Sequence, residues 1–464
     1  MVASVAAAVV SAILYGFAGP SASSATWLSA GVELLKGVWL ATPIVGVILA
    51  GLLFYLLLST CWSPQTDESQ TTVSPSRLRP TLFSICFLVG PFTETATGFG
   101  VGLVVSLGML LRTGLPKQDA IVFSLFSQML VPWGAFGVGT MLGAAFADMG
   151  DPRELGWRSA VLMAPVILAW LGGYWLMCRR VGLSTRFVDG GRELLWVVFV
   201  LAGFIGLSQY LEPDVVGVTV LGSAAALYGL ASGGASLRAK LMVAAPYIVL
   251  CACLITSRLW PSFHTLLRGV QIQPFADEAA WPILLSPVFW LVLVGLTFAL
   301  LRARANDVPG VFRMTWQRGK TAAGVTLLFV ICARFMMAGD IPGRLALELQ
   351  ATIGAVAAMV CSPLLAAIAG FLTASNSASN SLLMPNVVGL AHIGHWDVAW
   401  VAAIQNVTGS ALTMLSPVRI IMGCAIAALG AGTMGAIYRR AWFLGVAPVV
   451  LMVIAASVVV SVVP

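Results

Sequence analysis

Charged residues are scarce in this chain, and their scarcity excludes a soluble protein. They make up 9% of its 464 residues, whereas hydrophobic residues make up 59% and the mean hydropathy is +0.97. A soluble domain carries roughly a quarter charged residues because its surface faces water. The apolar residues are gathered in runs of roughly 18–25, the length that crosses about 30 Å of hydrocarbon as helix. The sequence therefore predicts an all-α polytopic membrane protein.

Residues that bind metals, form disulfides or catalyse reactions are also few. The eight cysteines form no CxxC pair, and the three histidines are scattered, so we expect neither a metal site nor a disulfide framework. The sequence has no G-x-x-x-x-G-K-[ST] motif, which argues against ATP-driven pumping. A membrane-embedded enzyme needs a nucleophile–base pair or metal ligands at membrane depth, and the polar segments contain no histidine. We expect no cofactor and no enzymatic activity.

The net charge of +7 comes largely from short loops between apolar runs, a pattern that orients a protein in a membrane. It predicts a multi-pass protein of the bacterial inner membrane, with the bilayer rather than nucleic acid as its surroundings. The strongest basic loops are 179–192 and 302–320, and Arg77 with Arg79, Arg238 with Lys240 and Arg439 with Arg440 add to them. We count about eleven spans, near 2–19, 37–58, 120–146, 159–178, 193–211, 215–231, 241–259, 283–301, 321–338, 401–428 and 441–463.

Two further apolar stretches, 81–111 and 350–390, are interrupted by small polar residues. All basic loops lie in the cytoplasm only if each stretch enters and leaves the membrane on one side. The two stretches then have opposite orientations, and each precedes one long span. Re-entrant hairpins in inverted repeats are typical of secondary transporters. We expect one transport domain, 1–464, that contains two such units, 81–146 and 350–428.

The first hairpin carries Glu94 between Gly90-Pro91 and Gly98-x-Gly100. A carboxylate at membrane depth costs at least about 2.5 kcal/mol, and broken backbone survives there only beside protein or a water-filled cavity. Glu94 is therefore a candidate proton carrier or a hydrogen-bond anchor for the loop. The alternative is an interfacial loop with Glu94 in water. We assign Thr95, Thr97 and Gly98 of this hairpin to the substrate site.

The second hairpin supplies neutral donors and acceptors from Ser375, Asn376, Ser377 and Asn380. Backbone N–H groups at a helix N-terminus and the helix dipole both favour an anion, so this segment suits a small carboxylate. A solvated interhelical loop is the alternative.

The long span that follows the second hairpin is interrupted by Gln405, Asn406 and Thr408, which we add to the substrate site. Arg419 and Arg334 also lie within apolar runs. An intramembrane arginine usually pairs with an anion, and a guanidinium fits a carboxylate through two hydrogen bonds. Either arginine could pair with Glu94 or extend to an interface instead. Arg419 is the preferred substrate ligand, because Arg334 lies near the end of its span.

At these residues the sequence resembles the L-lactate permease family. A first family signature, Phe-x-Glu-x-x-x-Gly-Phe-Gly, is met by Phe92 to Gly100, and a Gly-Ala-x-Gly-type stretch follows from Trp133 to Thr140. The second signature corresponds to Phe371 to Asn380 and the third to Gln405 to Pro417. The three keep the family's order and spacing over the whole chain.

This chain departs from the family pattern at three places. Asn376 stands where the family has an acid, which leaves Glu94 as the candidate carboxylate of the two hairpins. Val101-Gly102 replaces the usual Thr-Pro or Ala-Pro, and the chain is short at its N-terminus by one leading span. The resemblance implies proton symport of L-lactate or a related small 2-hydroxy monocarboxylate, with Glu94 taking the proton. It also suggests, by analogy, an elevator-type fold whose hairpin tips meet at the substrate.

Two other functions remain open. The chain could transport another organic anion, a dicarboxylate or a sulfonate, coupled to sodium, because Ser/Asn hairpins and unwound carbonyls also coordinate Na⁺. Two buried arginines, Arg334 and Arg419, would suit a doubly charged substrate. A passive channel is the other alternative. The sequence leaves open a homo-oligomer and the identity of the acid.

Overall fold

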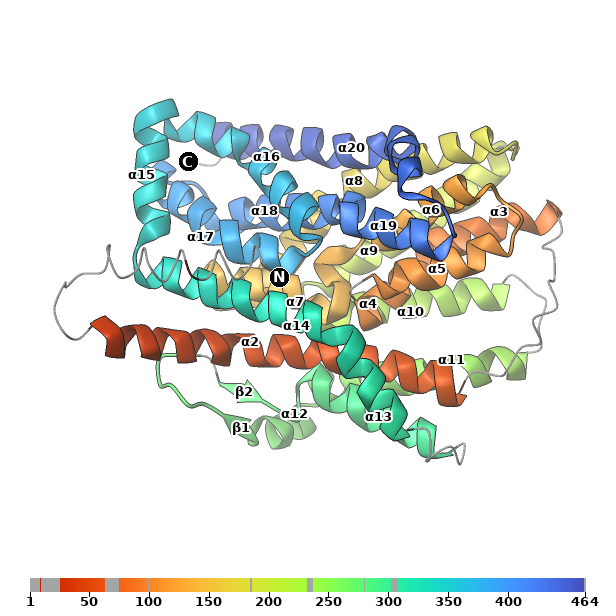
Figure 1. Cartoon of the computed structure of the whole chain (residues 1–464), viewed down its shortest axis with the longest axis horizontal. Coiled ribbons are helices and arrows are strands. Elements are labelled where there is room, and N and C mark those ends of the chain that lie inside the picture. Colours follow the sequence, from red (N-terminus) through yellow and green to blue (C-terminus); the bar gives the residue numbers. More distant parts are fainter. Residues whose placement is uncertain are drawn as a thin grey trace.

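The structure, a computed structural model, is a bundle of long helices that run along its longest axis (Figure 1). It describes residues 9, 26–62, 75–98, 100–183, 186–231, 237–278, 280–301 and 308–462. The expected span 2–19 and two arginines of the basic loops, Arg302 and Arg304, lie outside these ranges.

The α-helices are α2 (Thr26–Leu57), α3 (Pro75–Phe83), α4 (Gly90–Thr97), α5 (Val101–Leu111), α6 (Lys117–Leu125), α7 (Gly134–Phe146), α8 (Pro152–Arg180), α9 (Phe187–Leu207), α10 (Pro213–Ala231), α11 (Leu237–Leu259), α12 (Pro261–Arg268), α13 (Pro287–Leu301), α14 (Val308–Ala338), α15 (Ile341–Ile353), α16 (Ala355–Thr373), α17 (Asn376–Gly394), α18 (Val398–Leu412), α19 (Pro417–Ile426) and α20 (Met434–Val462). Two π-helical segments are η1 (Leu58–Trp62) and η2 (Ser84–Val89); short 3₁₀ turns are η3 (Phe126–Gln128), η4 (Val131–Trp133), η6 (Thr413–Leu415) and η7 (Ala431–Thr433). Strands β1 (Gln271–Ile272) and β2 (Trp281–Pro282) pair antiparallel, with Gln271 opposite Pro282.

The prediction of a helical polytopic membrane protein is confirmed. Eight helices in the described ranges are long and apolar enough to cross a membrane, and up to ten spans result if each of two bent helix pairs counts as one. One of these pairs, Lys117–Gln128 with Val131–Phe146, bends by 56°. The expected span 120–146 is therefore two helices that meet at a break. The count of about eleven spans stays a prediction.

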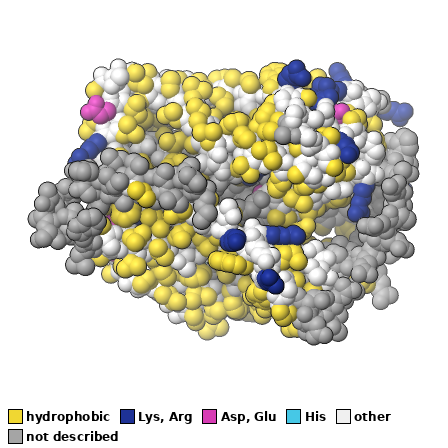
Figure 2. Space-filling view, in the orientation of Figure 1, with side chains coloured by type: hydrophobic (Ala, Val, Ile, Leu, Met, Phe, Trp, Pro, Cys, Tyr) yellow, Lys and Arg dark blue, Asp and Glu magenta, His cyan; other side chains and the backbone are white. Residues whose placement is uncertain are grey.

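The start of α3 and the end of α8, which carry basic residues, lie at one end of the bundle, on the right in Figure 1, and Lys and Arg side chains are most numerous on the right of the face in Figure 2, with others near its centre and left. Ion pairs hold this end together. Arg180 and Arg440 both lie within 4 Å of Asp119, at 3.8 and 3.3 Å. Arg79 makes a bidentate pair with the buried Glu193 over 2.8 Å. By the positive-inside rule this basic end is expected to face the cytoplasm.

Two helical hairpins enter the bundle from opposite ends. The first hairpin consists of α4 and α5, and α3, η2 and the loop to α6 join it to the basic end (Figure 1). The second hairpin consists of α16 and α17 and follows α15 at the opposite end. Each hairpin turns on backbone that leaves the α-region: Gly98 and Gly100 have φ of +73° and +81°, and Ala374 has φ of +55°. The first hairpin is followed by the broken α6–α7 pair, the second by α18, η6 and α19.

Local sequence explains where several of these helices begin. Ser375 caps α17 by accepting the N–H of Ala378 over 3.3 Å, and Asp397 caps α18 by accepting the N–H groups of Ala399 and Trp400. Such caps satisfy N–H groups that have no partner inside the helix. Pro417 occupies the first turn of α19, where its missing N–H costs nothing.

Candidate functional site

The tips of the two hairpins meet at a small cavity. Its volume is about 40 Å³, which is room for roughly three water molecules. The walls come from α4, η4, α7, α19 and the turn between α16 and α17. The lining residues are Glu94, Gly98, Val131, Gly134, Ala135, Val138, Gly139, Ala374, Ser375, Asn376, Ser377 and Arg419.

Glu94 holds the tip of the first hairpin together. Its side chain is 2% exposed. Oε1 accepts the N–H of Gly100 over 3.1 Å, and Oε2 accepts the N–H of Gly102 over 3.0 Å and Nε2 of Gln128 over 3.1 Å. The carboxylate thus satisfies N–H groups at the start of α5, where a negative charge also complements the helix dipole. This geometry is that of the hydrogen-bond anchor, one of the two roles expected for Glu94.

The second tip presents a helix N-terminus to the same cavity. Ala374 is left-handed, Ser375 is extended, and α17 starts at Asn376. Ser375, Asn376 and Ser377 line the cavity. Their backbone N–H groups lie in the first turn of α17, where the positive end of the helix dipole favours an anion.

Arg419 on α19 brings a buried positive charge to this cavity. It is 5% exposed. Its Nη2 donates to the carbonyl oxygen of Ala374 over 3.3 Å, which links α19 to the second tip. Its Nη1 has no hydrogen-bond partner among the described residues. A buried donor without a partner costs about 1–3 kcal/mol, and more when the group is charged. An anion in the cavity would remove that cost.

The start of α7 passes between the two tips in an unusual conformation. Ala135, Phe136 and Gly137 are all left-handed, with φ of 49°, 56° and 65°. Non-glycine residues adopt this region only under strain, which is often stored at functional sites. The turn also brings Ala135 against the first tip, since a Cβ on Gly98 would lie 2.4 Å from the Cβ of Ala135.

Behind the cavity, a network of buried side chains joins α7, α8, α17 and α18 through Asn406. Its Oδ1 accepts Nδ2 of Asn376 over 2.8 Å and Nδ2 of Asn380 over 2.9 Å. Its Nδ2 donates to the hydroxyls of Thr140 and Ser159 over 3.0 and 2.9 Å. Asn380 also donates to the carbonyl of Gly139 over 2.9 Å. Such a network fixes the position of Asn376 on the cavity wall.

The structure brings about half of the expected site residues to the cavity. Glu94, Gly98, Ser375, Asn376, Ser377 and Arg419 line it. Asn380 and Asn406 belong to the network behind it, and Gln405 donates to the hydroxyl of Ser379 over 3.2 Å. The other three are buried, lie outside the lining and donate to carbonyls of their own helices: Thr95 to Phe92, Thr97 to Thr93 and Thr408 to Ile404.

Sequence analysis did not assign Gln128, Ala135 or Val138 to the site. Gln128 is a polar residue in an apolar run, and that signal could have identified it as a partner of Glu94. Ala135 and Val138 carry no such signal, because their place depends on the left-handed turn. Thr140 and Ser159 likewise enter the network only through the packing of α7 and α8 against α18.

Arg334 lies elsewhere and is neutralised. Its Nε contacts Glu33 over 2.6 Å and its Nη2 contacts Glu278 over 2.9 Å. It does not line the cavity. The suggestion that two arginines serve one doubly charged substrate therefore loses its second arginine. Burial holds the pKa of Glu278, in the loop after β1, above its ordinary value, while Arg334 acts in the opposite direction.

Comparison with known proteins shows similarity to L-lactate permeases. The family described as L-lactate permease matches residues 270–463. The L-lactate permease of Escherichia coli K12 is 24% identical over 464 residues, which cover 85% of this chain and 80% of that protein. The L-lactate permease of Salmonella typhi is 25% identical over 187 residues, 39% of this chain and 31% of that protein.

Two solved structures of transporters resemble the fold at low similarity. The YdaH transporter of Alcanivorax borkumensis aligns with a TM-score of 0.39 and 14% identity, covering 91% of this chain and 84% of that one. MtrF of Neisseria gonorrhoeae aligns with a TM-score of 0.34 and 13% identity, covering 82% and 81%. This chain is a multi-pass membrane protein whose sequence is similar to L-lactate permeases over 85% of its length.

Proposed function

We propose that this protein is a secondary active transporter that carries L-lactate, or a related small 2-hydroxy monocarboxylate, together with a proton. One observation carries the proposal: the buried guanidinium of Arg419 lines the small cavity between the hairpin tips and keeps Nη1 without a partner in the described structure. The N-terminus of α17 lies on the same cavity. A carboxylate placed there would accept from Arg419 and from backbone N–H groups.

The charges of the cavity favour a monoanion. Within the described part of the lining, Arg419 is the one cation and Glu94 the one acid. A second guanidinium, which a dicarboxylate would need, is not supplied by Arg334, because Glu33 and Glu278 already neutralise it. Ser375, Ser377 and Asn376 offer neutral groups for the 2-hydroxyl.

Glu94 is the proposed proton carrier. With Glu94 ionised and Arg419 charged, the cavity has no net charge, and an incoming anion would leave one uncompensated negative charge in a low-dielectric site. Protonation of Glu94 restores neutrality. A protonated carboxyl accepts fewer hydrogen bonds, so it would loosen Gly100 and Gly102 at the first tip. Proton uptake would thereby be linked to movement of this hairpin.

The hairpins would move apart to admit substrate. A lactate ion is larger than a space of about 40 Å³, so the described arrangement would not hold the ion without such a movement. We propose that the units 81–146 and 350–428 act as inverted repeats that expose the cavity to one side of the membrane and then to the other.

A sodium-coupled carrier of another organic anion is the second candidate. Oδ1 of Asn376 and Oδ1 of Asn380 are buried and have no donor among the described residues. Amide and backbone carbonyl oxygens suit hard cations such as Na⁺, and the carbonyl of Gly139 lies beside them. The substrate of such a carrier would be a sulfonate or a dicarboxylate.

A competition experiment distinguishes the substrate classes. Uptake of labelled L-lactate into proteoliposomes is measured with an excess of unlabelled lactate, glycolate, malate or a small sulfonate. The proposal expects lactate and glycolate to compete and malate and the sulfonate to compete weakly. Strong competition by malate or by the sulfonate with no competition by glycolate would contradict it and favour the second candidate.

A further inference from the structure

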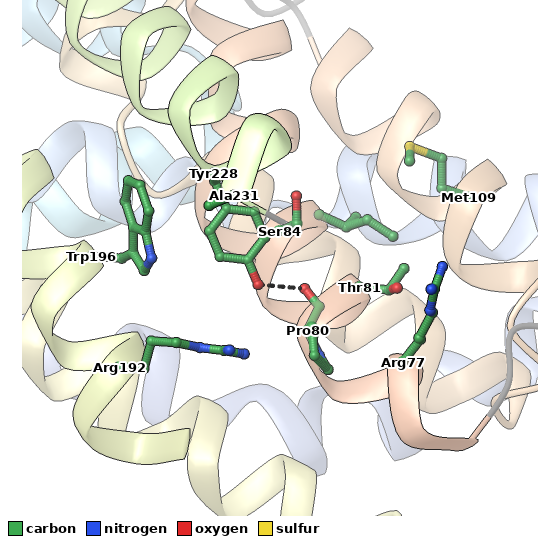
Figure 3. A pocket seen from close by; sticks show the side chains of 10 residues that line it. Arg77, Pro80, Thr81, Ser84, Met109, Arg192, Trp196, Tyr228 and Ala231 are labelled. Carbon is green, nitrogen blue, oxygen red and sulfur yellow. Dashed lines mark hydrogen bonds between the residues drawn. The ribbon is translucent and has the colours of Figure 1, made fainter. Parts of the chain in front are cut away.

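A second and larger cavity lies at the basic end of the bundle, away from the cavity at the hairpin tips. Its volume is about 450 Å³, and it lies between α3, η2, α5, α9 and α10. Arg77 on α3 and Arg192 on α9 extend toward it from different helices (Figure 3). None of its lining residues lines the cavity at the hairpin tips.

Among the residues that the structure describes, none that lines this cavity is acidic, so the described wall does not compensate the two arginines. Glu193 follows Arg192 in the chain but turns to other partners. It pairs bidentately with Arg79 and accepts Nε1 of Trp175 over 2.8 Å. The cavity therefore carries two positive charges, and planar guanidinium groups bind phosphate oxygens through paired hydrogen bonds.

The remaining polar groups also suit an anion. The hydroxyl of Tyr228 donates to the carbonyl oxygen of Pro80 over 3.1 Å, so this carbonyl presents less negative charge to the cavity (Figure 3). Thr81 and Ser84 line the same wall from α3 and η2. Their hydroxyls are donors that can rotate toward a phosphate oxygen.

The surroundings of the cavity are those of a lipid-facing surface. Trp196 lines it and packs edge-on against Tyr228, with ring centroids 5.3 Å apart. On the same helix, Leu195 is 70% exposed and Phe199 48% exposed. A helix that exposes large apolar side chains in a membrane protein faces acyl chains, and tryptophan is typical of the membrane–water boundary. The cavity therefore opens where lipid headgroups lie rather than in bulk water.

We propose that this cavity binds the phosphate group of an anionic phospholipid of the cytoplasmic leaflet, with the guanidinium groups of Arg77 and Arg192 on the phosphate oxygens and the acyl chains along α9. Basic pockets between membrane helices on the cytoplasmic side are the usual form of such sites. The pocket adjoins α3 and η2, which lead into the hairpin that carries Glu94. A lipid bound there would hold the entry of that hairpin in place.

The test measures lipid affinity directly. The full chain is purified in detergent, and native mass spectrometry gives the bound fraction during titration with phosphatidylglycerol or phosphatidylcholine. Wild-type protein should prefer phosphatidylglycerol, and the double variant R77Q/R192Q should lose about tenfold in affinity for it. R77K/R192K keeps both charges and should retain most of the binding, which separates loss of charge from misfolding.

A matched control removes two arginines from the same end but outside the cavity. R112Q/R186Q changes two exposed side chains and should keep the preference of the wild type. Equal losses in R77Q/R192Q and R112Q/R186Q would overturn the proposal, because they would indicate a diffuse attraction to anionic lipid. Competition by glycerol phosphate at concentrations similar to those of the lipid would also overturn it, since a soluble phosphate ester would then be the ligand.

Discussion

The carboxylate of Glu94 accepts the backbone N–H of Gly102, eight residues further along the chain, over 3.0 Å. This contact spans the tip of the first hairpin and joins α4 to the start of α5. Together with the bond from Gly100, it makes the acid a part of the backbone turn. The same group is the one carboxylate among the described residues of the cavity wall. Its charge state and the shape of the tip are thus linked.

Replacement of Glu94 by glutamine should separate exchange from net transport. The amide cannot take up and release a proton, so lactate accumulation driven by a proton gradient should fall to background. Lactate–lactate exchange should persist. Both are measured in the same proteoliposomes. The variant E94D keeps an ionisable group and should retain some accumulation. Equal loss of exchange and accumulation in E94Q would mean that the residue acts only as an anchor of the tip.

Removal of the Arg419 guanidinium should weaken substrate binding. A charge-assisted hydrogen bond contributes about 1.5–3 kcal/mol, so R419A should raise the KM for lactate by at least about tenfold. The matched control is R334Q, which removes an arginine of α14 that pairs with Glu33 and Glu278 away from the cavity. Its KM should stay near that of the wild type. An unchanged KM in R419A would remove this arginine from the site.

Asn406 should matter for stability far more than its neighbour Thr408. The variant N406A removes four hydrogen bonds, to the amides of Asn376 and Asn380 and to the hydroxyls of Thr140 and Ser159, which should lower the free energy of unfolding by about 2–4 kcal/mol. The hydroxyl of Thr408 bonds only to the carbonyl of Ile404 in its own helix, so T408V should cost under about 1 kcal/mol. Thermal unfolding in detergent compares them. Similar Tm values would contradict the role of the network.

Gly139 is expected to tolerate no side chain. A Cβ there would lie 2.5 Å from Nδ2 of Asn376, so G139A must displace an amide of the cavity wall. Overpacking of this kind costs about 1–3 kcal/mol, and initial uptake rates should fall by about tenfold or more. Gly172 on α8 has nothing within 4 Å of such a Cβ, and G172A should transport normally. Normal uptake by G139A would show that Asn376 is not placed as described.

Stability should decrease as the pH rises through neutrality, because of Glu212 in the loop between α9 and α10. The nearby carboxylate of Asp214, followed by desolvation, raises the pKa of Glu212 from 4.5 to about 7, against an opposing effect of Arg258. Between these two values the folded protein binds the proton that the unfolded chain releases, so folding is favoured at the lower pH. The Tm should be higher at pH 5.5 than at pH 8, and E212Q should reduce the difference. The control E348Q, on α15, should leave it unchanged.

Part of this site could be predicted from sequence because polar residues in apolar runs are costly. That cost identifies Glu94, Asn376 and Arg419, all of which line the cavity. The same cost also identifies Arg334, which the sequence set apart from Arg419 only by its place near the end of its span. The acids that neutralise Arg334, Glu33 and Glu278, come from distant parts of the chain and could not be predicted.

Conformation and helix packing limit prediction in other places. Ala135 is an ordinary apolar residue in the sequence and lines the cavity only because three successive residues are left-handed. Thr95 and Thr97 were expected to face substrate, but their hydroxyls bond within α4, as threonines in helices often do. Arg77 and Arg192 line the same proposed lipid pocket only because α3 packs against its neighbouring helices, which the sequence does not reveal.

Proton-coupled lactate uptake tests the central claim most directly. Purified protein in liposomes is given an inward proton gradient alone, an inward sodium gradient alone, or neither, and labelled L-lactate is followed over time. The account predicts accumulation above equilibrium with the proton gradient, abolished by a protonophore and indifferent to sodium. Lactate accumulation that follows the sodium gradient and ignores the pH gradient would contradict it.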